Sequence, residues 1–254
     1  MRMQFYVLTL FPEMIRSGMN TSITGRAMAK GLIGLQTVNI RDYAPPERKG
    51  RVDDYPYGGG AGMVMQAQPV YAAWESLCQA SGRKIRTVYM TPQGSVFDQN
   101  KARELAREEE LCLLCGHYEG IDERALDEIV TDSISIGDYV LTGGELPAMV
   151  VMDAVARMVP GVLSNHDSGT DESFMNGLLE YPQYTRPEEW NGRKVPEILL
   201  SGHHANVDKW RHEQALQRTL IRRPDLLDQA PLDEKDFKIL KELKEQAKTS
   251  CGDI

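Results

Sequence analysis

The sequence predicts an α/β fold, with a parallel sheet covered by helices on both faces and a smaller, mostly helical C-terminal domain. Two observations support this prediction. Between residues 3 and 159, short apolar runs typical of strands alternate with amphipathic stretches typical of helices, which is the pattern of a parallel α/β sheet. Beyond a polar stretch at 165–177, helical patterns predominate. The 254 residues are 41% hydrophobic and 26% charged, a globular composition long enough for one large domain or two small ones.

The N-terminal elements are two strands, a helix and a long loop. MQFYVLTL (3–10) is an apolar run without a small-residue cleavage site after it, so it predicts a strand and not a signal peptide. TSITGRAMAKG (21–31) predicts a helix that begins at a hydroxyl cap and ends at a glycine. GLQTVNIRDY (34–43) alternates like a strand. Residues 44–65 are rich in proline, glycine and charge, and predict a long loop, which is usually functional or mobile.

Three further strand–helix units complete the predicted sheet. The strands are expected at 84–90, 111–115 and 129–136, and the helices near 67–80, 98–109, 121–128 and 145–159. The helix at 145–159 is apolar almost all round. We therefore expect it to be buried against the sheet and to offer a surface to a second subunit.

The domain boundary is expected at the polar segment NHDSGTDESFMNG. We expect an α/β domain at 1–163, a linker at 164–176 and a helical domain at 177–254, with helices near 205–222 and 232–247. The sequence shows neither an internal repeat nor a low-complexity tract.

Charge and cysteine usage limit the classes of function. The net charge of −8 argues against attraction of the whole chain to nucleic acid. Charge is uneven, because the segment 205–224 carries five basic and two acidic residues, which is either a local basic surface or a solvated helical face. The four cysteines give no disulfide framework, which favours a cytoplasmic location. We expect no membrane helix, since no run approaches about 18 apolar residues.

The CxxC spacing of Cys112 and Cys115 is the most tempting metal or redox pattern. Both cysteines fall in one apolar strand, however, where alternation turns them to opposite faces. The motifs indicate no metal site.

Three loops follow the carboxyl ends of predicted strands, namely TPQG, GHYEG and GDYVLTGG. In open α/β sheets this edge holds the ligand crevice, and glycine lets the backbone approach a ligand closely. The glycines either close tight turns or form a binding site, and three such loops at one edge favour a site. YGGGAGM (57–63) follows a polar segment and not a strand, and no P-loop is present, so a Rossmann or NTPase site is disfavoured.

Five motifs together resemble the bacterial tRNA (guanine-N1)-methyltransferases of the knotted SPOUT superfamily. They are PYGGGAGM (56–63), LCGHYEGID (114–122), SIGDYVLTGGELPAM (135–149), GLLEYPQYTRP (177–187) and LLSGHHANVDKWR (199–211). The resemblance implies a trefoil knot that holds S-adenosylmethionine, and methylation of the guanosine just 3′ of the tRNA anticodon. It also implies a homodimer in which the linker and C-terminal domain of the second subunit close each pocket. Mg²⁺ is associated with the family, although no motif here identifies its site.

The resemblance implies specific roles for residues. Those expected to bind the methyl donor are Tyr89, Met90, Thr91, Pro92, Gly116, Tyr118, Glu119, Ser135, Ile136, Gly137, Asp138, Tyr139, Val140, Leu141, Gly143, Gly144 and Pro147. Arg157 is expected to stabilise charge on guanine O6, although a cation ending a helix is its simpler interpretation. Glu172 is expected to remove the N1 proton, with Asp171 as the alternative base. The family pattern has Asp where this chain has Glu172, so the extra methylene places the carboxylate differently.

RNA contacts are expected from two groups of residues. Asp53 and Glu180 match acidic positions near the target guanosines, and Lys209, Arg211 and Arg218 suit backbone phosphates. The expected partners are tRNA and a second copy of the chain, with no DNA or membrane partner. Two alternatives stay open: another SPOUT methyltransferase acting on rRNA or on a ribose, and a cofactor-sensing RNA-binding protein without turnover.

Overall fold

The computed structural model describes residues 3–163 and 172–250. The chain divides into two compact units, Met1–Ser164 and Asn165–Ile254, each described here by itself.

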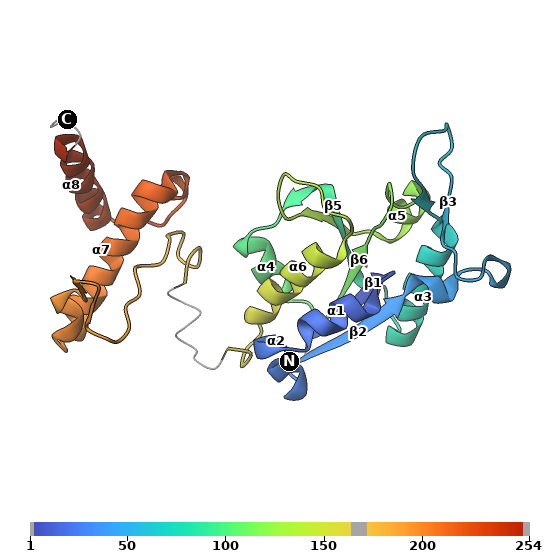
Figure 1. Cartoon of the computed structure of the whole chain (residues 1–254), viewed down its shortest axis with the longest axis horizontal. Helices are drawn as coiled ribbons and strands as arrows, with labels where there is room; N and C mark the ends of the chain where they lie inside the picture. Colours follow the sequence, from blue (N-terminus) through green and yellow to red (C-terminus); the bar gives the residue numbers. More distant parts are fainter. Residues whose placement is uncertain (1–2, 164–171, 251–254) are drawn as a thin grey trace. The chain divides into compact units, whose positions relative to one another are not determined.

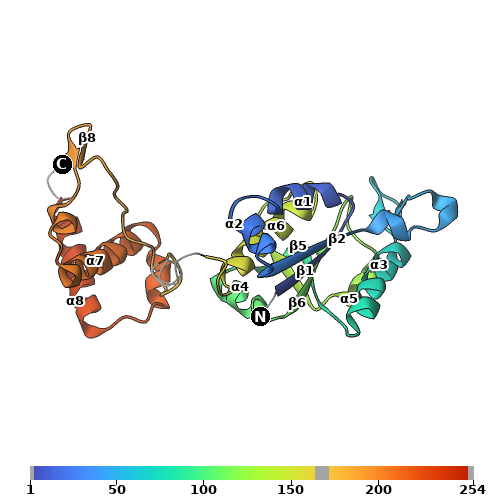
Figure 2. The same cartoon turned by 90° about the horizontal axis from the view of Figure 1, so that it is seen from below.

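The N-terminal unit is built on a five-stranded parallel sheet in the order β2-β1-β6-β5-β7 (Figures 1 and 2). The strands are β1 (Met3–Thr9), β2 (Ile33–Asn39), β5 (Arg86–Val96), β6 (Glu110–Cys115) and β7 (Asp132–Ser135). The predicted α/β class and parallel sheet are confirmed. All five strands run in one direction, so their carboxyl ends share an edge.

Two separate hydrophobic cores lie on the two faces of this sheet. One core packs under α1 (Pro12–Met19), α2 (Ser22–Ala29), α4 (Gln99–Leu105) and α6 (Glu145–Arg157), and the other under α3 (Ala67–Ser81) and α5 (Glu123–Ile129). Figures 1 and 2 show these two groups of helices on opposite sides of the strands. Alternation along β6 places Cys112 in one core and Cys115 in the other, as predicted. Burial raises the pKa of Cys112 to about 12, so it stays a thiol.

The structure differs from the predicted elements in several places. The predicted helix near 98–109 ends at Leu105, and the predicted strand at 129–136 is limited to β7, because Ile129 ends α5. Helix α1 was not predicted; it begins with Pro12 at its first turn and buries Ile15 and Met19. Strand β5 continues through the predicted TPQG turn, with a shift of register between Met90 and Ser95. The predicted strand at 34–43 is shorter, because Ile40–Tyr43 forms a 3₁₀ turn (η1).

The long segment 44–65 has more structure than the predicted loop. It contains the 3₁₀ turn η2 (Pro46–Arg48) and a small hairpin of β3 (Asp53–Asp54) and β4 (Val64–Met65). Met65 also forms a parallel bridge with Ile121. The hairpin therefore joins the loop that follows β6.

The C-terminal unit is mostly helical, as predicted. It contains α7 (His204–Arg222), α8 (Glu234–Ser250), the 3₁₀ turns η4 (Glu197–Leu200) and η5 (Pro224–Asp228), and a hairpin of β8 (Glu189–Trp190) and β9 (Arg193–Lys194). Its core gathers Leu178, Ala215, Leu216 and Leu240. His212 of α7 lies 2.6 Å from a carboxylate oxygen of Asp236 of α8, which ties the two long helices together.

None of the helices within 3–163 and 172–250 is long and apolar enough to span a membrane. The same residues contain no group of three His, Cys, Asp or Glu side chains placed to hold a metal ion.

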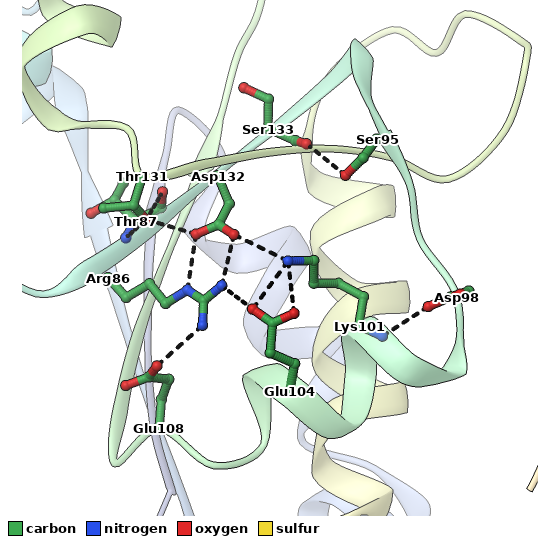
Figure 3. Close-up of polar contacts among 10 residues, drawn as sticks. All are labelled: Arg86, Thr87, Ser95, Asp98, Lys101, Glu104, Glu108, Thr131, Asp132 and Ser133. Carbon is green, nitrogen blue, oxygen red and sulfur yellow. Dashed lines mark hydrogen bonds and ion pairs between the residues drawn. The ribbon is translucent and has the colours of Figure 1, made fainter.

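A cluster of charges joins the first residues of β5 and β7 to α4 (Figure 3). Nε and Nη2 of Arg86 donate to the Asp132 carboxylate, at 2.9 and 2.7 Å. The same guanidinium also donates to the carboxylates of Glu104 and Glu108. Lys101 adds a contact of 3.3 Å to Asp132. The Arg86 hydrogen bonds are the main cause that lowers the pKa of Asp132 to about 2.

We predict that Asp132→Asn lowers the free energy of unfolding by about 2 kcal/mol at neutral pH. The folded-state pKa lies below the ordinary 3.8, so this contribution is present above about pH 4 and is lost as the pH falls through about 2. Urea unfolding across this range measures it. Glu13→Gln is the matched control, because the Glu13–Arg16 pair is exposed and such pairs contribute little. Equal losses in the two variants would contradict the prediction.

Candidate active site

A cavity of about 340 Å³ opens at the carboxyl edge of the sheet. Three segments line it: the bulged part of β5, the loop after β6 and the loop between β7 and α6. All the residues predicted to bind the methyl donor line this cavity except Asp138, which belongs to the third segment without lining it. The lining also includes Gln93, His117, Gly120, Ile134 and Thr142.

The loops approach one another so closely that only glycine fits between them. Gly144 N donates to Gly116 O at 3.0 Å. A Cβ atom on Gly144 would lie 2.6 Å from Cys115 Cα, closer than real contacts allow. On the other side, a Cβ on Gly94 would lie 2.3 Å from Ile134 N. The cavity wall is therefore a stack of bare backbone segments. The trefoil knot that the resemblance implies stays a prediction.

The third segment is folded by its own polar groups. The Ser135 hydroxyl accepts from Gly137 N at 3.2 Å and donates to Gly137 O at 3.1 Å. Tyr139 N also donates to Gly137 O, at 2.9 Å. Gly137 has φ +148°, a conformation that side chains disfavour. This tight bend turns the following residues back over the cavity.

A buried carboxylate fixes the wall behind the cavity. Glu145, at the first turn of α6, is 2% exposed. It accepts from the Thr9 hydroxyl at 2.6 Å and meets His117 Nε2 at 3.1 Å. The His117 ring also packs on Phe11, with centroids 4.8 Å apart. The sequence does not predict this link, because Thr9 and Glu145 are 136 positions apart.

The cavity carries little charge. Its lining residues include one carboxylate, Glu119, and neither lysine nor arginine. Burial raises the pKa of the Tyr89 phenol, which therefore stays neutral. Such a wall offers backbone donors and acceptors, apolar contacts and a slight negative charge. It suits a ligand with a hydrogen-bonding ring edge and a positive centre.

A second cavity, of about 370 Å³, lies within the C-terminal unit. It brings together three residues predicted for catalysis or RNA binding, namely Glu172, Glu180 and Arg211. The Arg211 guanidinium lies 4.9 Å from the centre of the Tyr181 ring. Residues 172–180, partly assigned by prediction to the linker, form turns here, with Phe174 N donating to Leu178 O at 2.8 Å.

Four other predicted residues, which the structure describes, lie outside both cavities. Arg157 is the last residue of α6, about 15 Å further along the helix axis than Pro147. Asp53 lies in β3 and is 3.6 Å from Arg51. Lys209 lies on α7, 3.7 Å from Glu213, and Arg218 lies further along the same helix. Asp171 is outside the described residues.

The fold and this cavity define an α/β protein with a backbone-lined ligand site at the carboxyl edge of a parallel sheet. A sequence model of the family described as "tRNA (Guanine-1)-methyltransferase TrmD" matches residues 3–229. The chain therefore belongs to this methyltransferase family, whose chemistry requires a methyl donor.

Proteins named tRNA (guanine-N(1)-)-methyltransferase are similar to the chain over nearly its whole length. The one from Lachnospira eligens is 60% identical over 227 residues, which covers 89% of this chain and 96% of that protein. The one from Ruminiclostridium cellulolyticum is 58% identical, covering 90% of this chain and 98% of that protein. A Bacillus cereus protein is 53% identical, covering 96% of this chain and 100% of its own length.

We predict that Gly144→Ala disrupts the cavity, because its φ of −80° suits alanine and only the clash with Cys115 opposes the change. Unfolding should become easier by roughly 1–3 kcal/mol. The affinity for the methyl donor, tested with S-adenosylmethionine by calorimetry, should fall at least about tenfold, since the walls must move apart. Asp132→Asn is the matched control: it lowers stability away from the cavity and should leave this affinity unchanged. An unchanged affinity of Gly144→Ala for the donor would contradict the assignment of this cavity to the methyl donor.

Proposed function

We propose that this chain transfers the methyl group of S-adenosylmethionine to N1 of the guanosine immediately 3′ of the tRNA anticodon. The observation that carries this proposal is the cavity at the carboxyl edge. It is supported by relatives that are named tRNA (guanine-N(1)-)-methyltransferase and that align with this chain over nearly their whole length. A tRNA substrate and the cysteine usage both favour the cytoplasm as its place of action.

The cavity fits S-adenosylmethionine by the chemistry of its lining. Adenine needs hydrogen bonds to its edge and apolar contact on its faces. The backbone of the glycine-containing loops offers the hydrogen bonds, and Leu141, Ile136 and Pro147 offer the apolar contacts. A wall with one carboxylate and no basic side chain accommodates the positively charged sulfonium. When bound, this donor supplies an electrophilic methyl group.

The reaction then needs a base and a cation from the chain. N1 of guanine must lose its proton, and the negative charge that develops on O6 needs a nearby positive group. We assign the base to Glu172, which lines a cavity together with Glu180, and the cation to Arg157. A carboxylate that accepts guanine N–H donors would also serve base identity.

We also propose that the working form is a homodimer. Arg157 lies at the end of α6, about 15 Å beyond the part of the helix that lines the cavity. This spacing favours a role in the cavity of a second subunit. The same helix exposes Leu146 (45%) and Val150 (48%) one turn apart, which supports an interface along α6.

The proposal is tested by incubating the purified chain with tritiated S-adenosylmethionine and total tRNA. Label should enter tRNA, and nucleoside analysis should show 1-methylguanosine. In a parallel incubation with rRNA, label in rRNA but not in tRNA would establish one of the alternatives, as would label in a ribose. Donor binding without any incorporation would establish a cofactor-sensing protein.

We predict that Glu172→Gln lowers kcat by a factor of about 10² to 10⁴, because the amide cannot accept the N1 proton. Binding of S-adenosylmethionine should stay near normal, since Glu172 does not line the first cavity. Single-turnover kinetics and calorimetry measure the two effects. Asp171→Asn is the matched control and should stay active. An active Glu172→Gln beside an inactive Asp171→Asn would move the base to Asp171.

We predict that Val150→Glu yields a monomer without methyl transfer, because a charge would be buried at the subunit interface. Sedimentation equilibrium at micromolar protein gives the oligomeric state. Phe237→Glu, at an exposed apolar position of α8 (61%), is the control and should leave the dimer intact. A fully active monomeric Val150→Glu would exclude a dimeric active form.

A further inference from the structure

The loop between β3 and β4 exposes two aromatic rings that the proposed function does not use. Tyr57 is 100% exposed and Tyr55 75%. Figures 1 and 2 show the segment around β3 projecting beyond α3. Solvent exposure of whole phenol rings leaves their apolar area unburied, so such rings commonly serve a partner.

The base of this loop is hydrogen-bonded to a segment of the donor-cavity wall. Glu119 N donates to Met63 O, and Met65 N donates to Gly120 O, each at 2.9 Å. Asp122 N donates back to Met65 O, also at 2.9 Å. Three backbone hydrogen bonds therefore fasten the loop to the segment that supplies Glu119 and Gly120 to the cavity.

Packing at the end of the loop confirms that this connection is close. A Cβ atom on Gly62 would lie 2.2 Å from Glu119 Oε1, so the Glu119 side chain lies directly against the end of the loop. Tyr57 also lies within electrostatic range of Arg124. The Asp122 hydrogen bond is the main cause that raises the pKa of Arg124, and Tyr57 adds to it. Arg124 is itself 77% exposed and pairs with Asp122 at 2.7 Å.

We propose that residues 55–63 form a stacking arm for the tRNA substrate, in which Tyr57, assisted by Tyr55, stacks on an unpaired base near the methylated guanosine. This inference rests on the proposed function. Proteins hold single-stranded RNA by stacking its bases on aromatic side chains, with arginine or lysine near the phosphates. The arm supplies the rings and Arg124, in the first turn of α5, supplies a guanidinium, while the backbone connection to the wall places the stacked nucleotide close to the methyl donor.

RNA suits this arm better than a second copy of the chain. A protein interface needs a contiguous apolar core, whereas the residues between the two tyrosines and Met63 are proline, glycine and alanine. A base needs only one flat face, which a single exposed ring supplies.

The test uses the full chain with tRNA and three variants, Tyr57→Leu, Tyr57→Phe and Tyr57→Trp. Tyr57→Leu should weaken tRNA binding about fivefold or more, because it removes the flat ring. Tyr57→Phe should bind within about twofold of the wild type, since stacking needs no hydroxyl. All variants should bind S-adenosylmethionine normally. The added tryptophan should lose fluorescence on tRNA addition, beyond the change of the three native tryptophans.

Two outcomes would overturn the proposal. One is wild-type tRNA affinity in Tyr57→Leu together with an unquenched Tyr57→Trp. The other is loss of the dimer in Tyr57→Leu, which would show that the ring contacts a second copy. Failure of the proposed function is separate: the wild type would then bind or ignore tRNA without transferring methyl, whatever the variants do.

Discussion

The contact between Gly144 and the Cys115–Gly116 backbone is the constraint on which the site depends. The hydrogen bond of 3.0 Å between Gly144 N and Gly116 O joins the start of α6 to the end of β6. This contact leaves no room for a side chain, so the two segments form a continuous wall of peptide groups. Helix α6 then begins with its first carboxylate, Glu145, directly behind that wall. The open edge of the sheet becomes a binding surface because backbone, and not side chains, closes it.

The two ends of the sheet are stabilised by different means. At the amino ends of β5 and β7, Arg86 and Asp132 form a bidentate pair within a cluster of charges. Behind the cavity, Glu145 makes one short hydrogen bond to Thr9 and one contact to His117. Both arrangements satisfy charged groups with fixed partners. The strands that carry the cavity loops are therefore fixed at both edges of the sheet.

The sequence predicts the features that depend on local pattern. Alternation and helical period identify the strands and most helices, and the same alternation separates Cys112 from Cys115. Features that depend on residues far apart in the sequence cannot be predicted from local pattern. The extension of β5 beyond Met90 depends on pairing with β7. From the sequence alone, Glu145 is only a polar residue at the start of a helix, and its contacts with Thr9 and His117 are seen only in the structure. The residues predicted to bind the methyl donor follow from the resemblance of long motifs, because periodicity identifies loops without indicating which ligand they bind.

The chemistry of the wall also explains how a chain could hold a reactive methyl donor without methylating itself. The proposed donor is an electrophile, and the nucleophiles nearest to it belong to the protein. Cys115 lies directly behind Gly144, and burial, with a further contribution from Glu145, raises its pKa well above the ordinary value, so it stays a thiol. Tyr89 stays a neutral phenol for the same reason. Thiolates and phenolates react far faster than their protonated forms. A wall in which this thiol and this phenol stay protonated would therefore preserve the proposed donor, and transfer would need a nucleophile deprotonated by the proposed base, Glu172, which is not part of the wall.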